Sequence, residues 1–156
     1  MSTHIMLIED NVEFADVLER RWLREDPTIM VSRAQTLAEG LLMLGLTRDF
    51  DGIVVDLNLP DSSGLHTFES IHAAAIGLPI VGCTADVVMA ESLTEEGVQV
   101  VAKDGTGFRP GAILRALKQP SLRDSCERAI AALEFEHAAR ERVFDLFNRF
   151  IPNAST

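Results

Sequence analysis

The segment GIVVDLNLPDSSG, residues 52–64, runs from an apolar strand straight into a carboxylate. Four small or apolar residues precede Asp56, and a proline turn and a glycine follow it. Burying a charged group costs free energy unless it is paired. A strand that finishes on Asp56 therefore needs a chemical reason, which the rest of the chain supplies.

Apolar strands and helical stretches alternate along the chain, a pattern typical of a parallel sheet covered on both faces. The spacing predicts strands over residues 4–9, 28–33, 52–56, 78–83 and 98–102. It predicts helices over 11–26, from the capping box Thr36–Glu39 onward, and over 64–75, 86–96 and 110–118. The predicted fold class is α/β, with a doubly wound five-stranded parallel sheet.

Helical periodicity assigns particular side chains to the core. In the first helix one face carries Val12, Ala15, Leu18 and Trp22. Met6, Met30 and Met43 lie in apolar patterns and are also expected in the core. His66 and His72, on the helix after Asp56, are expected to be solvated.

Pro120 marks the one predicted boundary, which divides residues 1–118 from a helical extension over 119–156. A single helix is predicted from there to Ile151. Its apolar positions follow spacings of three and four, with His137 and Arg140 in the middle, and are Ile130, Leu133, Phe144, Phe147 and Ile151. Two placements are open for this face: packed back on the first domain, or covered by a second copy in a homodimer.

Composition excludes several classes of protein. A net charge of −10 argues against nucleic-acid binding, which depends on Lys and Arg. The apolar runs are too short for a membrane span, and the N-terminus lacks the basic start of a secretory signal. Cys83 and Cys126 have no metal-ligand spacing and are expected to be reduced. We expect a cytoplasmic protein that binds neither nucleic acid nor membrane.

Polar residues stand at the carboxyl ends of the predicted strands. They are Glu9 and Asp10, Asp56, Thr84 and Lys103. In an open parallel sheet these ends face one crevice, where ligands bind. Three carboxylates in one crevice repel each other unless a cation offsets their charge, and Mg²⁺ favours oxygen ligands.

Each of these residues also has an ordinary structural explanation. Asp10 can cap the first helix, Asp56 can open a turn, Thr84 can cap the next helix and Lys103 can end a strand at the surface. It is their combination at adjacent strand ends that indicates a site.

The motifs resemble those of the receiver domain of bacterial two-component response regulators, similar to the chemotaxis regulators with a flavodoxin-like fold. The matching segments keep that family's order and spacing across residues 4–118, and are LIEDN (7–11), VVDLNLPDSSG (54–64), GCTA (82–85) and VAKDG (101–105). The resemblance implies a strand order of 2-1-3-4-5.

The resemblance also implies roles for individual residues. Asp56 is the phosphoacceptor, exposed at its strand tip. Glu9 and Asp10 bind Mg²⁺ directly or through water, and Asp56 with the backbone carbonyl of Asn58 completes the protein ligands. Thr84 and Lys103 each bind a phosphoryl oxygen. The phosphodonor is a phosphohistidine on a sensor histidine kinase or a histidine phosphotransfer protein.

Two positions depart from the family pattern. Val100 stands three residues before the lysine, where the family usually has an aromatic switch residue. Asp104 follows Lys103 in place of the frequent proline, and the loop after it is longer than usual. These departures predict an unconventional readout, through Phe108 or the terminal helix, although packing of Phe108 under the loop is the simpler expectation.

The function expected is a phosphorylation-controlled signalling module, not an enzyme beyond transfer to and from its own aspartate, with output by protein contact. The alternatives are a receiver-like dimerisation module that works without phosphorylation, or the receiver part of a longer effector protein. An aspartyl phosphatase is disfavoured, because such enzymes have a second aspartate where this chain has Asn58.

Overall fold

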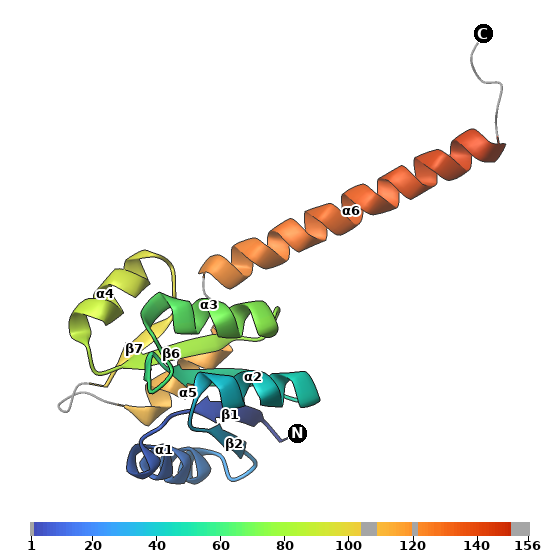
Figure 1. Cartoon of the computed structure of the whole chain (residues 1–156). Coiled ribbons are helices and arrows are strands. Elements are labelled where there is room, and N and C mark those ends of the chain that lie inside the picture. The colour runs from blue at the N-terminus through green and yellow to red at the C-terminus, as the bar shows by residue number, and fades with distance from the viewer. Residues whose placement is uncertain (1, 104–108, 120–121, 151–156) are drawn as a thin grey trace. The chain divides into compact units, whose positions relative to one another are not determined.

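The computed structural model describes residues 2–103, 109–119 and 122–150, with the side chains of the last segment described over 129–143. The chain divides into two compact units, Met1–Ser121 and Leu122–Thr156, each of which is described by itself. Figure 1 shows the elements of both units.

The first unit is built on one parallel sheet. Its strands are β1 (His4–Ile8), β2 (Met30–Ala34), β3 (Gly52–Asp56), β6 (Ile80–Thr84) and β7 (Val100–Ala102). They are ordered β2-β1-β3-β6-β7, with every neighbouring pair parallel. This order is the predicted 2-1-3-4-5, because the intervening β4 and β5 lie outside the sheet. The predicted doubly wound fold is confirmed.

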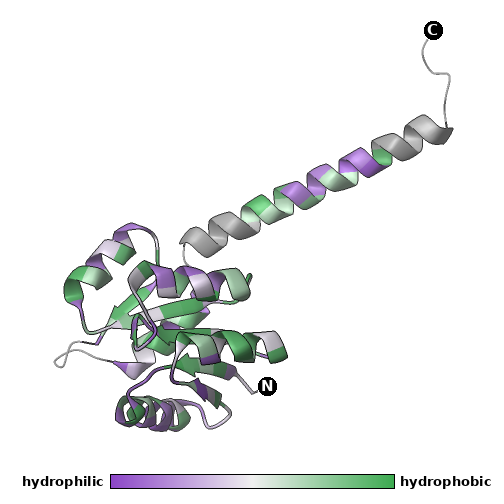
Figure 2. Ribbon diagram, in the orientation of Figure 1, coloured by the Kyte–Doolittle hydropathy of each residue, from purple (hydrophilic) through white to green (hydrophobic). Residues whose placement is uncertain are grey.

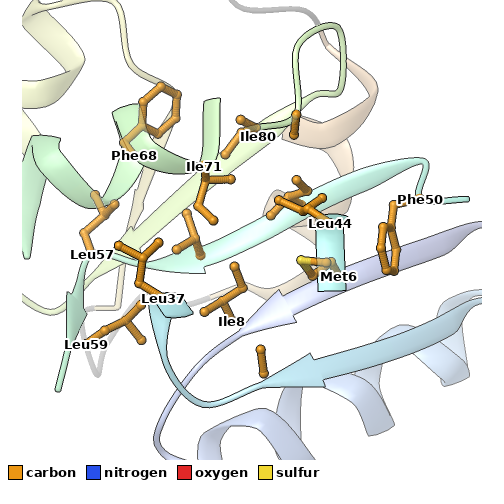
Figure 3. Packing of buried hydrophobic residues seen from close by; sticks show 14 of the residues in the cluster. Met6, Ile8, Leu37, Leu44, Phe50, Leu57, Leu59, Phe68, Ile71 and Ile80 are labelled. Atoms are coloured by element: carbon orange, nitrogen blue, oxygen red, sulfur yellow. The ribbon is translucent and has the colours of Figure 1, made fainter. Parts of the chain in front are cut away.

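Helices cover both faces of this sheet. They are α1 (Val12–Glu25), α2 (Leu37–Leu46), α3 (Gly64–Ala74), α4 (Val87–Glu95) and α5 (Pro110–Lys118). On one face α1 and α5 enclose a cluster around Trp22, whose indole Nε1 donates to the Pro110 carbonyl at 3.0 Å. On the other face α2, α3 and α4 cover a second cluster around Ile53 and Ile71, part of which is drawn in Figure 3.

The segment quoted first forms a short hairpin after β3. Its two-residue strands β4 (Asn58–Leu59) and β5 (Ser62–Ser63) are antiparallel. Gly64 closes the loop by donating its N–H to the Leu57 carbonyl at 2.7 Å, with a φ of +63° that favours glycine. Strands this short carry no alternation pattern, so the sequence predicted only a turn here.

Two core predictions are wrong. Val12 is 50% exposed, because it is the first residue of α1, one turn before buried Ala15. Met30 is 51% exposed, because β2 is an edge strand with little of its length buried. Met6 is fully buried, and Met43 packs against the cluster at half burial.

The second unit contains α6 (Leu122–Phe150), a helix of 29 residues. Figure 2 shows apolar and hydrophilic residues mixed along its described part. Ile130, Leu133, Phe135 and Val143 are all more than half exposed within this unit. Phe144, Phe147 and Ile151 of the predicted apolar face lie outside the described side chains.

Candidate functional site

Strand ends bring the predicted site residues together at one edge of the sheet. Glu9 and Asp10 follow β1, Asp56 ends β3, Thr84 ends β6 and Lys103 follows β7. Parallel pairing fixes this arrangement: Asp56 lies opposite Cys83, and Lys103 donates its N–H to the Thr84 carbonyl at 2.7 Å. The predicted crevice at the carboxyl edge of the sheet is therefore present.

Three carboxylates form an acidic cluster within this edge. Glu9, Asp10 and Asp56 each offer an oxygen, and these atoms lie within 4.8 Å of one another. Glu9 and Asp56 are buried, and Asp10 is exposed. Three converging carboxylates suit a hard divalent cation such as Mg²⁺ or Ca²⁺, which prefers oxygen ligands and offsets their mutual repulsion.

Lys103 pairs with two members of the acidic cluster. Its Nζ donates to Asp56 Oδ2 at 2.8 Å and to Glu9 Oε2. The same Nζ lies 4.3 Å from the centre of the Phe14 ring. The lysine side chain is only 12% exposed, so these contacts replace most of its hydration.

Burial sets the protonation of this cluster. Desolvation raises the pKa of Glu9 from 4.5 to about 7, and the charge of Asp56 adds to this effect, although Lys103 opposes it. Burial also acts to lower the pKa of Lys103, but hydrogen bonds to Asp56 and Glu9 outweigh it and raise that pKa. The ammonium therefore stays charged at neutral pH, whereas burial beside Asp56 favours protonation of Glu9.

Asp56 lines a pocket of about 180 Å³ together with its neighbours at the strand ends. The lining residues are Asp56, Asn58, Thr84, Ala85, Asp86, Met89 and Lys103. The Asp56 side chain is 9% exposed, which corrects the expectation of an exposed strand tip. Residues of the hairpin and of the start of α4 line the pocket beside this carboxylate.

Hydrogen bonds fix the groups around the pocket. Asp56 Oδ1 accepts the Asn58 N–H at 2.9 Å. Thr84 Oγ1 accepts the Asp86 N–H at 3.0 Å and donates towards Met89 Sδ at 3.8 Å. The pocket thus combines a carboxylate, a hydroxyl and an ammonium, which can bind the oxygens of a tetrahedral anion at the aspartate.

The residues that cap the helices differ from those considered in the sequence. Asn11, rather than Asp10, caps α1, and Asp86, rather than Thr84, caps α4. Asp10 and Thr84 are therefore not needed for capping. The capping explanation for these two residues is wrong.

The sequence prediction missed several site residues. Phe14 reaches Lys103 from α1, and Met89 and Asp86 reach the pocket from the start of α4. In the sequence, Phe14 is indistinguishable from the other apolar residues of its helix. Its position three residues after the helix cap Asn11 was the one available clue, because this places it in the turn beside Glu9.

The remaining polar candidates stay outside the site. His66 is exposed, and half-buried His72 stacks on Phe68 with ring centres 6.1 Å apart. Burial raises the pKa of the Cys83 thiol to about 12, so it is not a nucleophile. The side chain of Cys126 and the loop residues Asp104 and Phe108 lie outside the described part of the chain.

Val100 lies on β7 and is half-buried. It lines a second hollow of about 390 Å³ between β7 and α4, beside Val87, Ala90, Glu91, Thr94, Glu95 and Ala102. Because valine replaces the usual aromatic residue at this position, the side chain that lines the hollow here is small and apolar.

Comparison with protein families decides the identity of the first unit. The model of the response regulator receiver domain matches residues 5–108. The chain belongs to this family. Receiver domains of response regulators are generally not enzymes in the ordinary sense, but modules regulated within two-component systems.

A curated relative and two solved structures are also similar. The cell cycle transcriptional regulator CtrA of Caulobacter vibrioides is 34% identical over 77 residues, which are 49% of this chain and 32% of CtrA. The chain thus matches about a third of the length of this relative.

A response regulator from Burkholderia pseudomallei, solved with a phosphorylated aspartic acid, a calcium ion and citrate, is 27% identical with a TM-score of 0.61. The match covers 94% of this chain and 86% of that one. The regulator TrrA of Thermotoga maritima, solved with Mg²⁺ and BeF, is 18% identical with a TM-score of 0.62, covering 74% of this chain and 98% of that one. The second likeness shows the fold alone.

Among the described residues, none of the helices is both long and apolar enough to cross a membrane. Even α6, the longest, is interrupted by charged side chains along its described part.

Proposed function

We propose that this receiver domain takes a phosphoryl group onto Asp56 from a phosphohistidine, with Mg²⁺ bound by the acidic cluster. One observation carries the proposal: Lys103 Nζ bonds Asp56 Oδ2 at 2.8 Å inside a pocket that Thr84 also lines. This places an ammonium and a hydroxyl beside the carboxylate that would become an acyl phosphate. Such groups are suited to bind its oxygens.

Glu9, Asp10, Asp56 and the backbone carbonyl of Asn58 are the proposed protein ligands of Mg²⁺. The three converging carboxylates support this assignment because they fit a hard cation. The Burkholderia pseudomallei protein carries a calcium ion and the Thermotoga maritima protein carries Mg²⁺. When bound, the metal would offset the negative charge of the transferring phosphoryl group.

The transfer step uses an oxygen of Asp56 as the nucleophile. This oxygen attacks phosphorus, the P–N bond of the phosphohistidine breaks, and its electron pair stays on the imidazole nitrogen of the donor. The product is an acyl phosphate on Asp56 and, with a proton that the donor ring already carries on its other nitrogen or takes from water, a neutral histidine on the donor protein. Lys103 supplies positive charge to one phosphoryl oxygen, and the Thr84 hydroxyl turns from Met89 to donate to another.

The proposed donor is a sensor histidine kinase or a histidine phosphotransfer protein in the cytoplasm. Output by protein contact is favoured over DNA contact, since the net charge of −10 is unsuited to phosphate backbones. CtrA is a transcriptional regulator, but the match covers only a third of it, so an effector domain joined to this receiver remains the alternative output.

We propose that the chain forms a homodimer through α6, so that the extension 119–156 is the dimerisation element. Ile130, Leu133, His137 and Arg140 repeat at spacings of three and four, the pattern of a coiled-coil seam. Large apolar side chains contribute about 1.5 to 3 kcal/mol each when fully buried, so covering Ile130 and Leu133 favours association. This exposed face also favours the second candidate function, a dimerisation module that works without phosphorylation.

Sedimentation velocity of the full chain tests the dimer. We expect a dimer whose fraction rises with protein concentration, and a shift towards monomer in Leu133→Lys. Ala131→Lys is the matched control, because Ala131 lies on another side of the helix and is also exposed. A full chain that stays monomeric at all concentrations would contradict the proposed dimer. An equal fraction of dimer in both variants would also contradict it.

Phosphoramidate tests the phosphotransfer itself, because it is a small donor with the P–N bond of phosphohistidine. With Mg²⁺ the full chain should gain one phosphoryl group by intact mass, and Asp56→Asn should gain none. Asp61→Asn, the same change in the exposed hairpin turn, is the matched control and should still be phosphorylated. No gain of mass in the wild type would favour the dimerisation module.

A further inference from the structure

The ammonium of Lys103 has neighbours of two kinds. Glu9 and Asp56 accept hydrogen bonds from it, and the ring of Phe14 lies 4.3 Å away, measured from Nζ to the ring centre. An ammonium over a ring face is attracted by the negative charge of that face. The attraction is strongest where water is excluded, and Lys103 is 12% exposed.

Phe14 is held in place by the turn that follows the acidic pair. Asn11 donates its N–H to Glu9 Oε1 at 3.0 Å, and its side-chain Oδ1 accepts the Phe14 N–H at 3.0 Å. Phe14 is half-buried and packs against the cluster that contains Leu7 and Leu18. One turn of chain therefore fixes both a carboxylate and a ring that contact the lysine.

The ring differs from the carboxylates in what can displace it. A cation that binds the oxygens of Glu9 and Asp56 weakens their attraction for Lys103, because it offsets their negative charge. The ring face is a poor ligand for a hard cation, which prefers oxygen ligands. The ring therefore still attracts the ammonium when the carboxylates bind a cation. Without it, the flexible four-carbon stem of lysine could leave the pocket.

We infer that Phe14 is a positioning residue for Lys103, holding the ammonium beside Asp56 while the carboxylates bind a cation and the aspartate accepts a phosphoryl group. This inference rests on the proposed function for its role in transfer. The contact between ring and ammonium stands independently of it.

Two substitutions distinguish the attraction of the Phe14 ring for the ammonium from simple apolar packing. Phe14→Leu keeps an apolar side chain and removes the ring, whereas Phe14→Tyr keeps the ring. At saturating Mg²⁺, Phe14→Leu should lower the rate of phosphorylation of the full chain by phosphoramidate roughly 2- to 30-fold, the range that cation–π energies span. Phe14→Tyr should stay within about twofold of the wild type. Phe68→Leu, the same change in the other core cluster, is the control for general loosening.

A double-mutant cycle with Lys103→Met shows whether the ring acts through the lysine. In the Lys103→Met background, Phe14→Leu should change the residual rate by less than about 1.5-fold, because no ammonium is left to hold. The same four proteins are then unfolded in urea without metal. There Phe14→Leu should lower the midpoint more when Lys103 is present than when it is replaced.

The two cycles separate the inference from the proposed function. Equal effects of Phe14→Leu in both backgrounds, in rate and in unfolding, would overturn the inference and leave the ring a packing role. If the wild type gains no phosphoryl group from phosphoramidate, the proposed function fails. The unfolding cycle alone then decides whether Phe14 holds Lys103.

Discussion

Replacing Glu9 with glutamine should stabilise the metal-free protein at alkaline pH. Glu9 is 4% exposed and lies beside Asp56, and burial raises its pKa from 4.5 to about 7. A difference of this size corresponds to about 3 kcal/mol of unfavourable free energy for the charged form in the folded state. Glutamine has nearly the same shape and no charge, so it removes this cost.

The sign of the pH dependence follows from the raised pKa. The folded protein holds a proton on Glu9 to higher pH than the unfolded chain, so the free energy of unfolding falls as pH rises from about 4.5 to about 7. Below this window Glu9→Gln and the wild type should be nearly equal. Above it, at pH 8, the variant should be more stable by up to about 3 kcal/mol, because the raised pKa of Glu9 already includes its pairing with Lys103.

Urea unfolding at pH 5 and pH 8, in EDTA and in excess Mg²⁺, measures this effect. In Mg²⁺ the order should reverse, because the wild type gains binding free energy that the variant lacks. Glu13→Gln, an exposed glutamate on α1, is the control and should change neither comparison. A Glu9→Gln protein that is less stable than the wild type at pH 8 without metal would refute the reasoning.

Three other substitutions test separate parts of the account. Asp10→Ala should lose most of the rise in melting temperature that Mg²⁺ gives the wild type; an equal rise would place the ion elsewhere. Trp22→Phe should cost about 2 to 4 kcal/mol in urea unfolding, since it removes the indole donor to the buried Pro110 carbonyl and opens a void where the larger ring was. Asp61→Ala should lower the melting temperature at neutral pH. The amides of Leu37 and Ala38 hold the pKa of Asp61 below 3.8, so this difference should vanish as pH falls through that lowered pKa.

Much of the fold could be predicted because it depends on local patterns. The buried strands β3 and β6 are continuous apolar runs, and the helices between strands begin at recognisable caps such as Thr36, whose Oγ1 accepts the Glu39 N–H. Prediction failed where exposure depends on position in the sheet. Met30 on an edge strand and Val12 at the start of a helix are apolar residues, but no neighbouring element buries their side chains fully.

The site could be predicted in part for a topological reason. Parallel strands deliver their carboxyl ends to one edge, so Glu9, Asp56 and Lys103 could be expected together from the strand order alone. The burial of Asp56 could not be predicted from the sequence, because it depends on how residues of α4 and of the hairpin line its pocket. Phe14 was missed because an aromatic that packs and an aromatic that faces a cation give the same sequence pattern.

Locating the phosphoryl group within the chain tests the central claim most directly. The full chain is incubated with acetyl phosphate and Mg²⁺, the acyl phosphate is reduced with borohydride, and the digested protein is mapped by mass spectrometry. We expect one reduced residue, at Asp56 in the peptide that contains GIVVDLNLPDSSG. A reduced residue at another aspartate or glutamate, or none under conditions that label a control receiver, would contradict it.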